Sequence, residues 1–143
     1  MLAYPACFEP DESGFTVTFR DVPPAITYGD SLDEAMTMAV DALATALAGY
    51  GAPGLYRDVP SPSRPQPGER LVVLPALLAA KVELAIAMNT ARVSNSALAR
   101  RLGVSETVVR RLLSFRHRSH IGTLEAALAE LGKALVIEVR DAA

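Results

Sequence analysis

The sequence predicts an α+β fold in which a small sheet with one helix is followed by a helical region. Residues 15–22 alternate apolar and polar side chains, which is typical of a half-buried strand. Prolines crowd residues 59–70, where they disfavour helix and central strand. Beyond them, apolar residues recur at the three-to-four spacing of amphipathic helices. These observations predict an N-terminal domain at 1–60, an extended linker at 61–70 and a C-terminal domain at 71–143.

The N-terminal part is predicted to run β-β-β-α. Ser31 and Glu34 form the S-x-x-E capping box of a helix start, and Gly49 and Gly51 suit its end. The apolar face of this helix needs the apolar face of the sheet for burial. The predicted elements are strands at 3–8, 15–22 and 23–29, a helix at 30–51 and a short edge strand at 55–58.

The C-terminal part is predicted to be mostly helical and to end in a strand. Because an isolated strand is unstable, the alternating segment 134–140 needs a partner, either residues 71–74 or its copy in a second chain. The predicted elements are a strand at 71–74 and helices at 75–91, from Ser94 or Asn95 to Leu102, at 106–114 behind a Ser105 cap, and from a Thr123 cap to Gly132.

Composition excludes several classes of protein. No apolar run approaches the roughly 18 residues of a membrane span, and the N-terminus lacks the pattern of a signal peptide. A single cysteine, Cys7, can form neither an internal disulfide nor a cysteine-rich zinc site, and it is expected to be a small core residue. We therefore expect a cytoplasmic protein without a membrane partner.

Charge is distributed unevenly along the chain. The net charge is only −2, but residues 1–60 hold nine Asp or Glu and two Arg, a net of −7. Residues 92–120 hold seven Arg and one Glu, a net of +6. This asymmetry predicts two partners of opposite character, although two independently solvated surfaces would show the same pattern.

The segment "SALARRLGVSETVVRRLLSFRHRS" fits a helix-turn-helix. Ala99 is the small residue where two helices cross, and Gly103 suits the turn between them. A plain helical hairpin with solvated arginines is the alternative. The predicted apolar interior consists of Leu98, Leu102, Val104, Val109 and Leu112.

The outer face of this unit has the chemistry of a DNA reader. Arginine can bind guanine through two hydrogen bonds, and a helix N-terminus suits a phosphate. So small a module makes few base contacts, and such proteins usually bind two half-sites with two copies of the module. This predicts a homodimer or a higher homo-oligomer. The predicted DNA contacts are Ser105, Glu106, Thr107, Arg110 and Arg111 on the second helix, and Arg116, Arg118 and Ser119 on the following loop.

His117 and His120 form an H-x-x-H pair in this basic loop. A metal site would need a third ligand, and no nearby Cys, Asp or His supplies one. We therefore expect two solvated histidines, and we predict no metal and no cofactor.

The order of several short motifs resembles the HicB antitoxin family of bacterial toxin–antitoxin pairs. The motifs are "YPACF", "GFTV", "RDVPP", "TYGDSLDEA" and "VPSPS", followed by the helix-turn-helix that one variant of the family carries. The family's P-D-L-P-G is here "RDVPP", without the glycine. The resemblance implies a partial RNase H-like N-terminal fold and a small, basic, RNA-cleaving partner toxin of the HicA type. It also implies that the helix-turn-helix binds operator DNA and represses the chain's own operon.

An acidic domain can complement a basic toxin, which predicts contacts from Asp11, Glu12, Asp21 and Asp30. A stand-alone regulator with an N-terminal ligand- or protein-sensing domain is the main alternative. A nuclease would need several carboxylates converging on metal ions, and no predicted strand carries a central inward carboxylate. We therefore expect no catalytic residues and no enzymatic activity.

Overall fold

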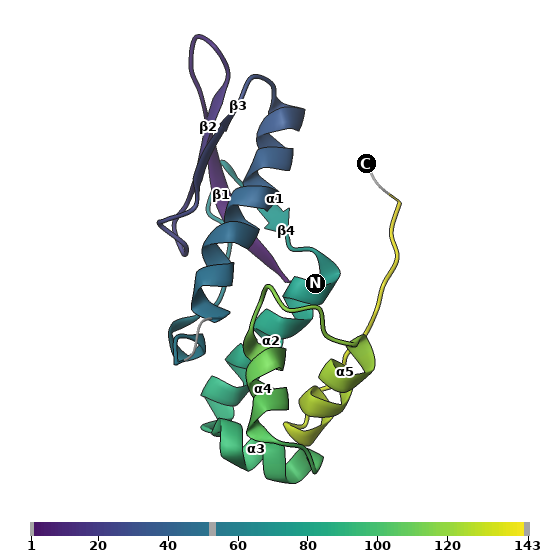
Figure 1. The fold of residues 1–143 in the computed structure, drawn as a ribbon. Helices are drawn as coiled ribbons and strands as arrows, with labels where there is room; N and C mark the ends of the chain where they lie inside the picture. Colours follow the sequence, from purple (N-terminus) through teal and green to yellow (C-terminus); the bar gives the residue numbers. More distant parts are fainter. Residues whose placement is uncertain (1, 52–53, 142–143) are drawn as a thin grey trace.

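The computed structural model describes residues 2–51 and 54–141, and it has the predicted α+β character (Figure 1). Within this described part, an antiparallel sheet of four strands lies beside five α-helices. The elements are β1 (Ala3–Pro10), β2 (Phe15–Phe19), β3 (Ile26–Gly29), α1 (Leu32–Ala48), the 3-10 helices η1 (Gly49–Gly51) and η2 (Tyr56–Asp58), β4 (Glu69–Val73), α2 (Ala76–Ala91), α3 (Asn95–Leu102), α4 (Glu106–Leu113) and α5 (Ile121–Glu130).

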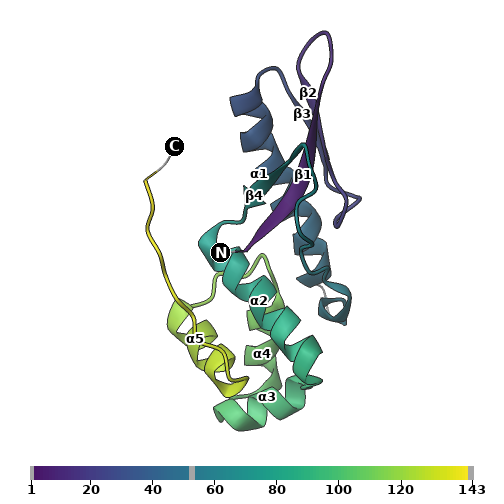
Figure 2. The same cartoon turned by 180° about the vertical axis from the view of Figure 1, so that it is seen from behind.

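The sheet has the strand order β3-β2-β1-β4, and α1 covers one of its faces (Figures 1 and 2). Ala6 of β1 pairs with Phe19 of β2, and Tyr4 pairs with Val72 of β4. All four side chains are buried, whereas the residues between them point to the other face. The half-buried Cys7 lies on that other face, so it is less buried than predicted.

Helix α1 begins at the predicted capping box. The Ser31 hydroxyl accepts a hydrogen bond from the Glu34 amide at 3.1 Å. The Glu34 carboxylate reaches back to the amide of Asp30 at 2.8 Å, one residue before the N-cap. The side chains of α1 that are buried against the sheet are Ala35, Ala39, Leu43 and Leu47.

The proline-rich segment leads back into the N-terminal sheet. The predicted strand at 71–74 is found at 69–73 and pairs with β1, so it completes this sheet instead of beginning the helical region. The main chain before it is held in place, because the Tyr4 hydroxyl donates to the Pro60 carbonyl at 2.6 Å. The predicted edge strand at 55–58 was wrong, since η2 occupies Tyr56–Asp58 and Leu55 is its N-cap residue.

The helical region contains the predicted helices, but the start of α5 and the exposure of Val104 differ from the prediction. Helix α5 starts at Ile121 and not after Thr123, because the His120 carbonyl already accepts hydrogen bonds from the Thr123 and Leu124 amides. Val104 is 37% exposed and does not belong to the apolar interior. Helix α2 starts beside β4 and packs against α4, α5 and η2 (Figures 1 and 2).

The C-terminal segment departs most from its predicted structure. Within the described residues, 134–140 form no strand, and β4 pairs only with β1. Val136, Ile137 and Val139 are 80%, 74% and 92% exposed. Leu135 packs against the core, and both ribbon views show the last part of the segment standing apart from the remaining chain (Figures 1 and 2). A single chain therefore gives this alternating segment no partner in the described structure.

Candidate nucleic-acid and protein interfaces

A tight turn joins α3 to α4 at the predicted position. Gly103 ends α3 in the left-handed conformation with φ of 68°, which a residue with a side chain rarely adopts. The amide of Val104 then returns to the carbonyl of Ala99 at 3.0 Å. Ala99 is only 4% exposed, as expected for a small residue between crossing helices. After the turn, Ser105, Glu106 and Thr107 are exposed to solvent at the start of α4.

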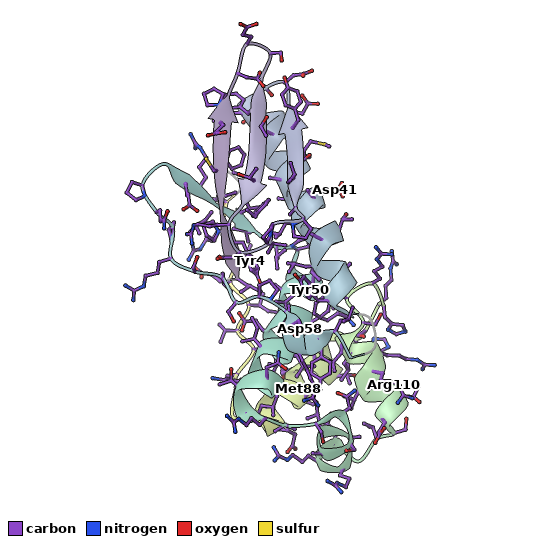
Figure 3. The ribbon with its side chains drawn as sticks, turned by 90° about the vertical axis from the view of Figure 1, so that its left-hand side faces the viewer. Tyr4, Asp41, Tyr50, Asp58, Met88 and Arg110 are labelled. Atoms are coloured by element: carbon purple, nitrogen blue, oxygen red, sulfur yellow. The ribbon has the colours of Figure 1, made fainter. Side chains whose placement is uncertain are left out.

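Helix α4 has one buried face and one polar face. Its buried residues are Val109, Leu112 and Leu113, which fix the helix on the core. The exposed residues are Ser105, Glu106, Thr107, Arg110 and Arg111, the group predicted to contact DNA. Figure 3 shows Arg110 on the outer side of α4.

Contacts along α4 orient one of the two arginines. Arg110 forms an i,i+4 ion pair with Glu106 at 3.6 Å and donates to the Thr107 hydroxyl at 3.0 Å. The pair is about half exposed, so it contributes little stability. Ser105 is the N-cap residue by backbone geometry, but the structure gives its hydroxyl no capping hydrogen bond within the described residues. Ser105 is exposed at the helix N-terminus, where its carbonyl accepts a hydrogen bond from the Val108 amide at 3.1 Å.

The loop after α4 places its residues on two sides. Arg116 and Arg118 are exposed, whereas Ser119 is half buried. The Ser119 hydroxyl lies 2.8 Å from Nζ of Lys81, inside the molecule. It also lies 3.3 Å from Nδ1 of His117. The structure thus places the two arginines where a ligand can reach them and points Ser119 inward.

A cleft of about 570 Å³ separates α4 from the C-terminal end of α1. Close packing forms one end of it, because a Cβ on Gly51 would lie 2.5 Å from the Phe115 amide nitrogen. The residues that give the cleft its basic character are Arg110, Arg111, Arg116 and His117. The N-terminal part of the chain therefore forms one wall of the arginine-rich surface.

The four predicted acidic contacts lie at opposite ends of the sheet. Asp11 and Glu12 occupy the β1–β2 turn, and Asp30 lies near them where β3 leads into α1 (Figure 1). The two connections are linked by the Tyr28 hydroxyl, which donates to the Ser13 hydroxyl at 3.0 Å. The structure therefore brings three of the four residues to one end.

Asp21 lies at the other end of the sheet and is bound within the chain. Its carboxylate accepts from the Ser63 amide at 2.8 Å and from the Ser63 hydroxyl at 2.9 Å. Arg20 adds an ion pair with Asp21 at 3.8 Å and a second with Glu69 at 2.9 Å. These contacts secure the proline-rich segment to the β2–β3 turn, which accounts for Asp21 without an external partner.

Asp11 also has an internal role, whereas Glu12 and Asp30 are exposed carboxylates. The Asp11 carboxylate accepts from the amides of Ser13 and Gly14 at 2.8 and 2.9 Å. These backbone hydrogen bonds lower the pKa of Asp11, so it remains ionised and closes the turn.

The described residues contain no group of three or more His, Cys, Asp or Glu side chains arranged to hold a metal ion. His117 and His120 are both exposed, and His120 serves as the N-cap residue of α5. No helix in the described ranges combines the length and apolar character that crossing a bilayer requires.

Comparison with known proteins assigns the chain to a family. Residues 3–83 match the model of the HicB-like antitoxins of bacterial toxin–antitoxin systems. Antitoxin HicB 2 of Photorhabdus laumondii subsp. laumondii is 44% identical over 134 residues, which cover 94% of each chain. The chain belongs to the HicB antitoxin family. Antitoxin HicB of Escherichia coli K12 is 33% identical over 135 residues, covering 94% of this chain and 96% of that protein. Antitoxin HicB of Pseudomonas fluorescens is 39% identical over 123 residues, covering 85% of this chain and 83% of that protein.

The region matched by the HicB family model ends within α2. It includes the whole sheet, α1, the proline-rich segment and Lys81. The matches to individual HicB antitoxins extend over most of the chain, and so they include much of the helical region as well. The family assignment thus agrees with the structural finding that β4 belongs with the N-terminal strands.

One residue of this HicB-family chain was missed by sequence reasoning. Lys81 has a fully buried side chain in α2, and its Nζ contacts the end of α4 and the following loop. Burial lowers the pKa of Lys81 to about 8, because desolvation disfavours the ammonium form. The sequence carried a signal: Lys81 and Glu83 are the two charged residues of an otherwise largely apolar helix, and a helix that is apolar all round is usually buried.

Proposed function

We propose that this HicB-family chain masks a small, basic, RNA-cleaving toxin of the HicA type and represses its own operon. In this proposal the chain is a binding protein without enzymatic activity. The observation that carries the proposal is the separation of charge. Glu12 and Asp30 are exposed on connections at the end of the sheet far from the helical region, whereas the exposed arginines belong to α4 and its loop; Figure 1 shows how far apart these elements lie. Two partners of opposite charge therefore have separate surfaces on the chain to bind at the same time.

The DNA-binding half of the proposal rests on α3 and α4 acting as a helix-turn-helix. The glycine turn, the buried Ala99 and the polar outer face of α4 support this assignment. In this arrangement α4 enters the major groove, where Arg110 and Arg111 are placed to read base edges. Arg116 and Arg118 hold phosphates beside the groove and fix the register.

Operator binding of this kind implies a homodimer. Helix-turn-helix proteins usually bind two half-sites that lie about one DNA turn apart. The C-terminal segment supports a seam between copies, because Ile137 and Val139 are exposed and have the two-residue spacing of one strand face, and Val136 is exposed as well. Pairing of this segment with its copy would satisfy its main-chain groups and bury these side chains.

The toxin-binding half of the proposal rests on the N-terminal domain, in which we infer a partial RNase H-like fold. Glu12 and Asp30 are its best candidates for direct contact, because both are exposed at the same end of the sheet. Asp11 shapes the turn that carries Glu12. Electrostatic attraction to a basic toxin would speed association, and contact with the toxin's catalytic face would block access to RNA.

The DNA-binding proposal is tested with Arg110→Ala and Arg111→Ala in the full chain. Each variant should weaken binding to a duplex from the chain's own promoter region by about 10-fold at roughly physiological salt. Toxin binding should not change. Arg64→Ala is the matched control, because Arg64 is exposed on the proline-rich segment away from α4. Unchanged DNA affinity in both variants would show that α4 is not the recognition helix.

The toxin-binding proposal is tested by co-purification with the product of the neighbouring reading frame, followed by charge reversal. Glu12→Lys and Asp30→Lys should slow association with the toxin, and the effect should diminish at high salt. Asp41→Lys is the control, because Asp41 is exposed on α1 (Figure 3). If no neighbouring protein binds, the alternative of a stand-alone regulator is favoured. Equal association rates for the three variants would exclude the acidic end as the docking surface.

A further inference from the structure

We propose that Lys81 is a positioning residue for operator binding, which joins the C-terminal end of α4 to the arginine-bearing loop that follows. This inference rests on the proposed DNA-binding function. Lys81 lies on α2 and does not reach the surface, since its exposed fraction is 0%. It therefore acts through the elements that it contacts and not on DNA itself.

The contacts of Lys81 bridge the helix end and the loop. Its Nζ lies 2.9 Å from the carbonyl oxygen of Arg111 and 3.2 Å from that of Leu112, both in the last turn of α4. It lies 3.0 Å from the carbonyl oxygen of Ser114 and 2.8 Å from the Ser119 hydroxyl, both in the loop. One nitrogen thus contacts both ends of the segment that carries Arg116 and Arg118.

The chemistry of a helix C-terminus explains why an ammonium suits this place. The last carbonyls of a helix have no partner within the helix, and they carry the negative end of its dipole. An ammonium supplies three N–H donors and a positive charge to such a group of oxygens. The Lys81 side chain that supplies these donors is fully buried, and its four hydrogen bonds are buried or part-buried.

Filling the core would not require a lysine at this position. The neighbouring buried residues of α2 are apolar, among them Val82, Leu84 and Ala85. Burying an ammonium costs more free energy than burying an apolar side chain of similar size. The N–H donors of the ammonium are therefore the distinctive property of Lys81. They hold the end of α4 and the following loop together.

By joining the loop to α4, Lys81 makes their arginines part of one rigid positive surface for DNA. Arg110 and Arg111 are placed by α4, whereas Arg116 and Arg118 depend on the path of the loop. A loop released from Lys81 would sample several paths, and its arginines would pay an ordering entropy on binding phosphate. Loss of Lys81 should therefore weaken the phosphate contacts of the loop and leave the base contacts of α4.

The test compares Lys81→Met with Lys133→Met in the full chain. Methionine has a similar length without a donor, and Lys133 is exposed and is the other lysine of the chain. Binding to the promoter duplex is measured at several salt concentrations, under conditions where circular dichroism shows both variants folded. For Lys81→Met we expect about 10-fold weaker binding and a salt slope reduced by about one per lost phosphate contact. Lys133→Met should match the wild type.

The outcomes separate the two proposals. If the wild-type chain does not bind the duplex, the operator proposal fails and the role of Lys81 fails with it. If the wild type binds and a folded Lys81→Met variant has the same affinity and salt slope, only the role of Lys81 is overturned. Reduced affinity with an unchanged slope would also overturn it, because a general loss of stability does not remove particular phosphate contacts.

A second measurement covers the case in which Lys81→Met does not fold. Isotope labelling of lysine in the wild-type chain gives two Nζ signals in nuclear magnetic resonance spectra, one for each lysine. The Lys81 ammonium should show slow hydrogen exchange, and addition of the promoter duplex should slow it further as the loop becomes ordered. Fast exchange at Lys81, or exchange that the duplex leaves unchanged, would contradict the proposal.

Discussion

Deprotonation of Lys81 should make the folded chain more stable as the pH rises above neutral. Burial lowers the pKa of Lys81 to about 8 in the folded chain, whereas its ordinary value is 10.5. Between these two pH values the unfolded chain binds a proton that the folded chain has released. The free energy of unfolding then increases with pH, because the state with fewer bound protons is favoured at high pH.

The magnitude follows from this pKa difference. The full slope is about 1.4 kcal/mol per pH unit, and integration between about pH 7.5 and 9.5 gives a gain of roughly 2 kcal/mol. His117, which is linked to Lys81 through the Ser119 hydroxyl, is present in the wild type and in Lys81→Met alike. Other groups that titrate in this range contribute equally to the pH dependence of both proteins, so their contributions cancel when the wild type is compared with Lys81→Met.

The assay is urea unfolding followed by circular dichroism at several pH values in this range. Relative to Lys81→Met, the wild type should gain roughly 2 kcal/mol in free energy of unfolding between the low and the high end of this pH range. Lys133→Met should keep the wild-type pH dependence. A constant difference between wild type and Lys81→Met would refute the reasoning, because it would mean that the carbonyl contacts fully offset the desolvation of the ammonium.

Two further predictions concern backbone packing and the C-terminal segment. Gly29→Ala should lower the free energy of unfolding by about 2 kcal/mol, because the new Cβ would lie 2.3 Å from the amide nitrogen of Ala35. Gly49→Ala is its control in urea unfolding, since it meets no atom within 4 Å there, and an equal loss in both variants would contradict the packing argument. Ile137→Asp with Val139→Asp should convert the proposed dimer to monomer in light scattering and weaken operator binding, because charges would enter the seam. A dimer that survives both substitutions would place the seam elsewhere.

Short-range patterns in the sequence were sufficient for most of the local structure. The capping box located the start of α1, and the helix buries one apolar face, as predicted. Gly103 was correctly assigned to the turn before α4, because its positive φ is a local requirement. These features depend on residues a few positions apart, which a single sequence displays directly.

Charge and motif order were also informative about the candidate surfaces. The residues predicted on the outer face of α4 are exposed, because the apolar period of a helix determines which side it buries. The internal contacts of Asp11 and Asp21 were not foreseen. Asp21 is held by Ser63, more than 40 positions away, and no local pattern announces such a pair.

The sequence by itself determined the fold class, the helical elements, the charge separation and the family resemblance. Only the tertiary structure decided that β4 completes the N-terminal sheet, that Lys81 holds the end of α4, and that residues 134–140 find no partner within one described chain. The physical reason is the range of the interactions. Caps, turns and amphipathic periods are set by neighbouring residues, whereas strand pairing and buried donors depend on which distant segments the fold brings together.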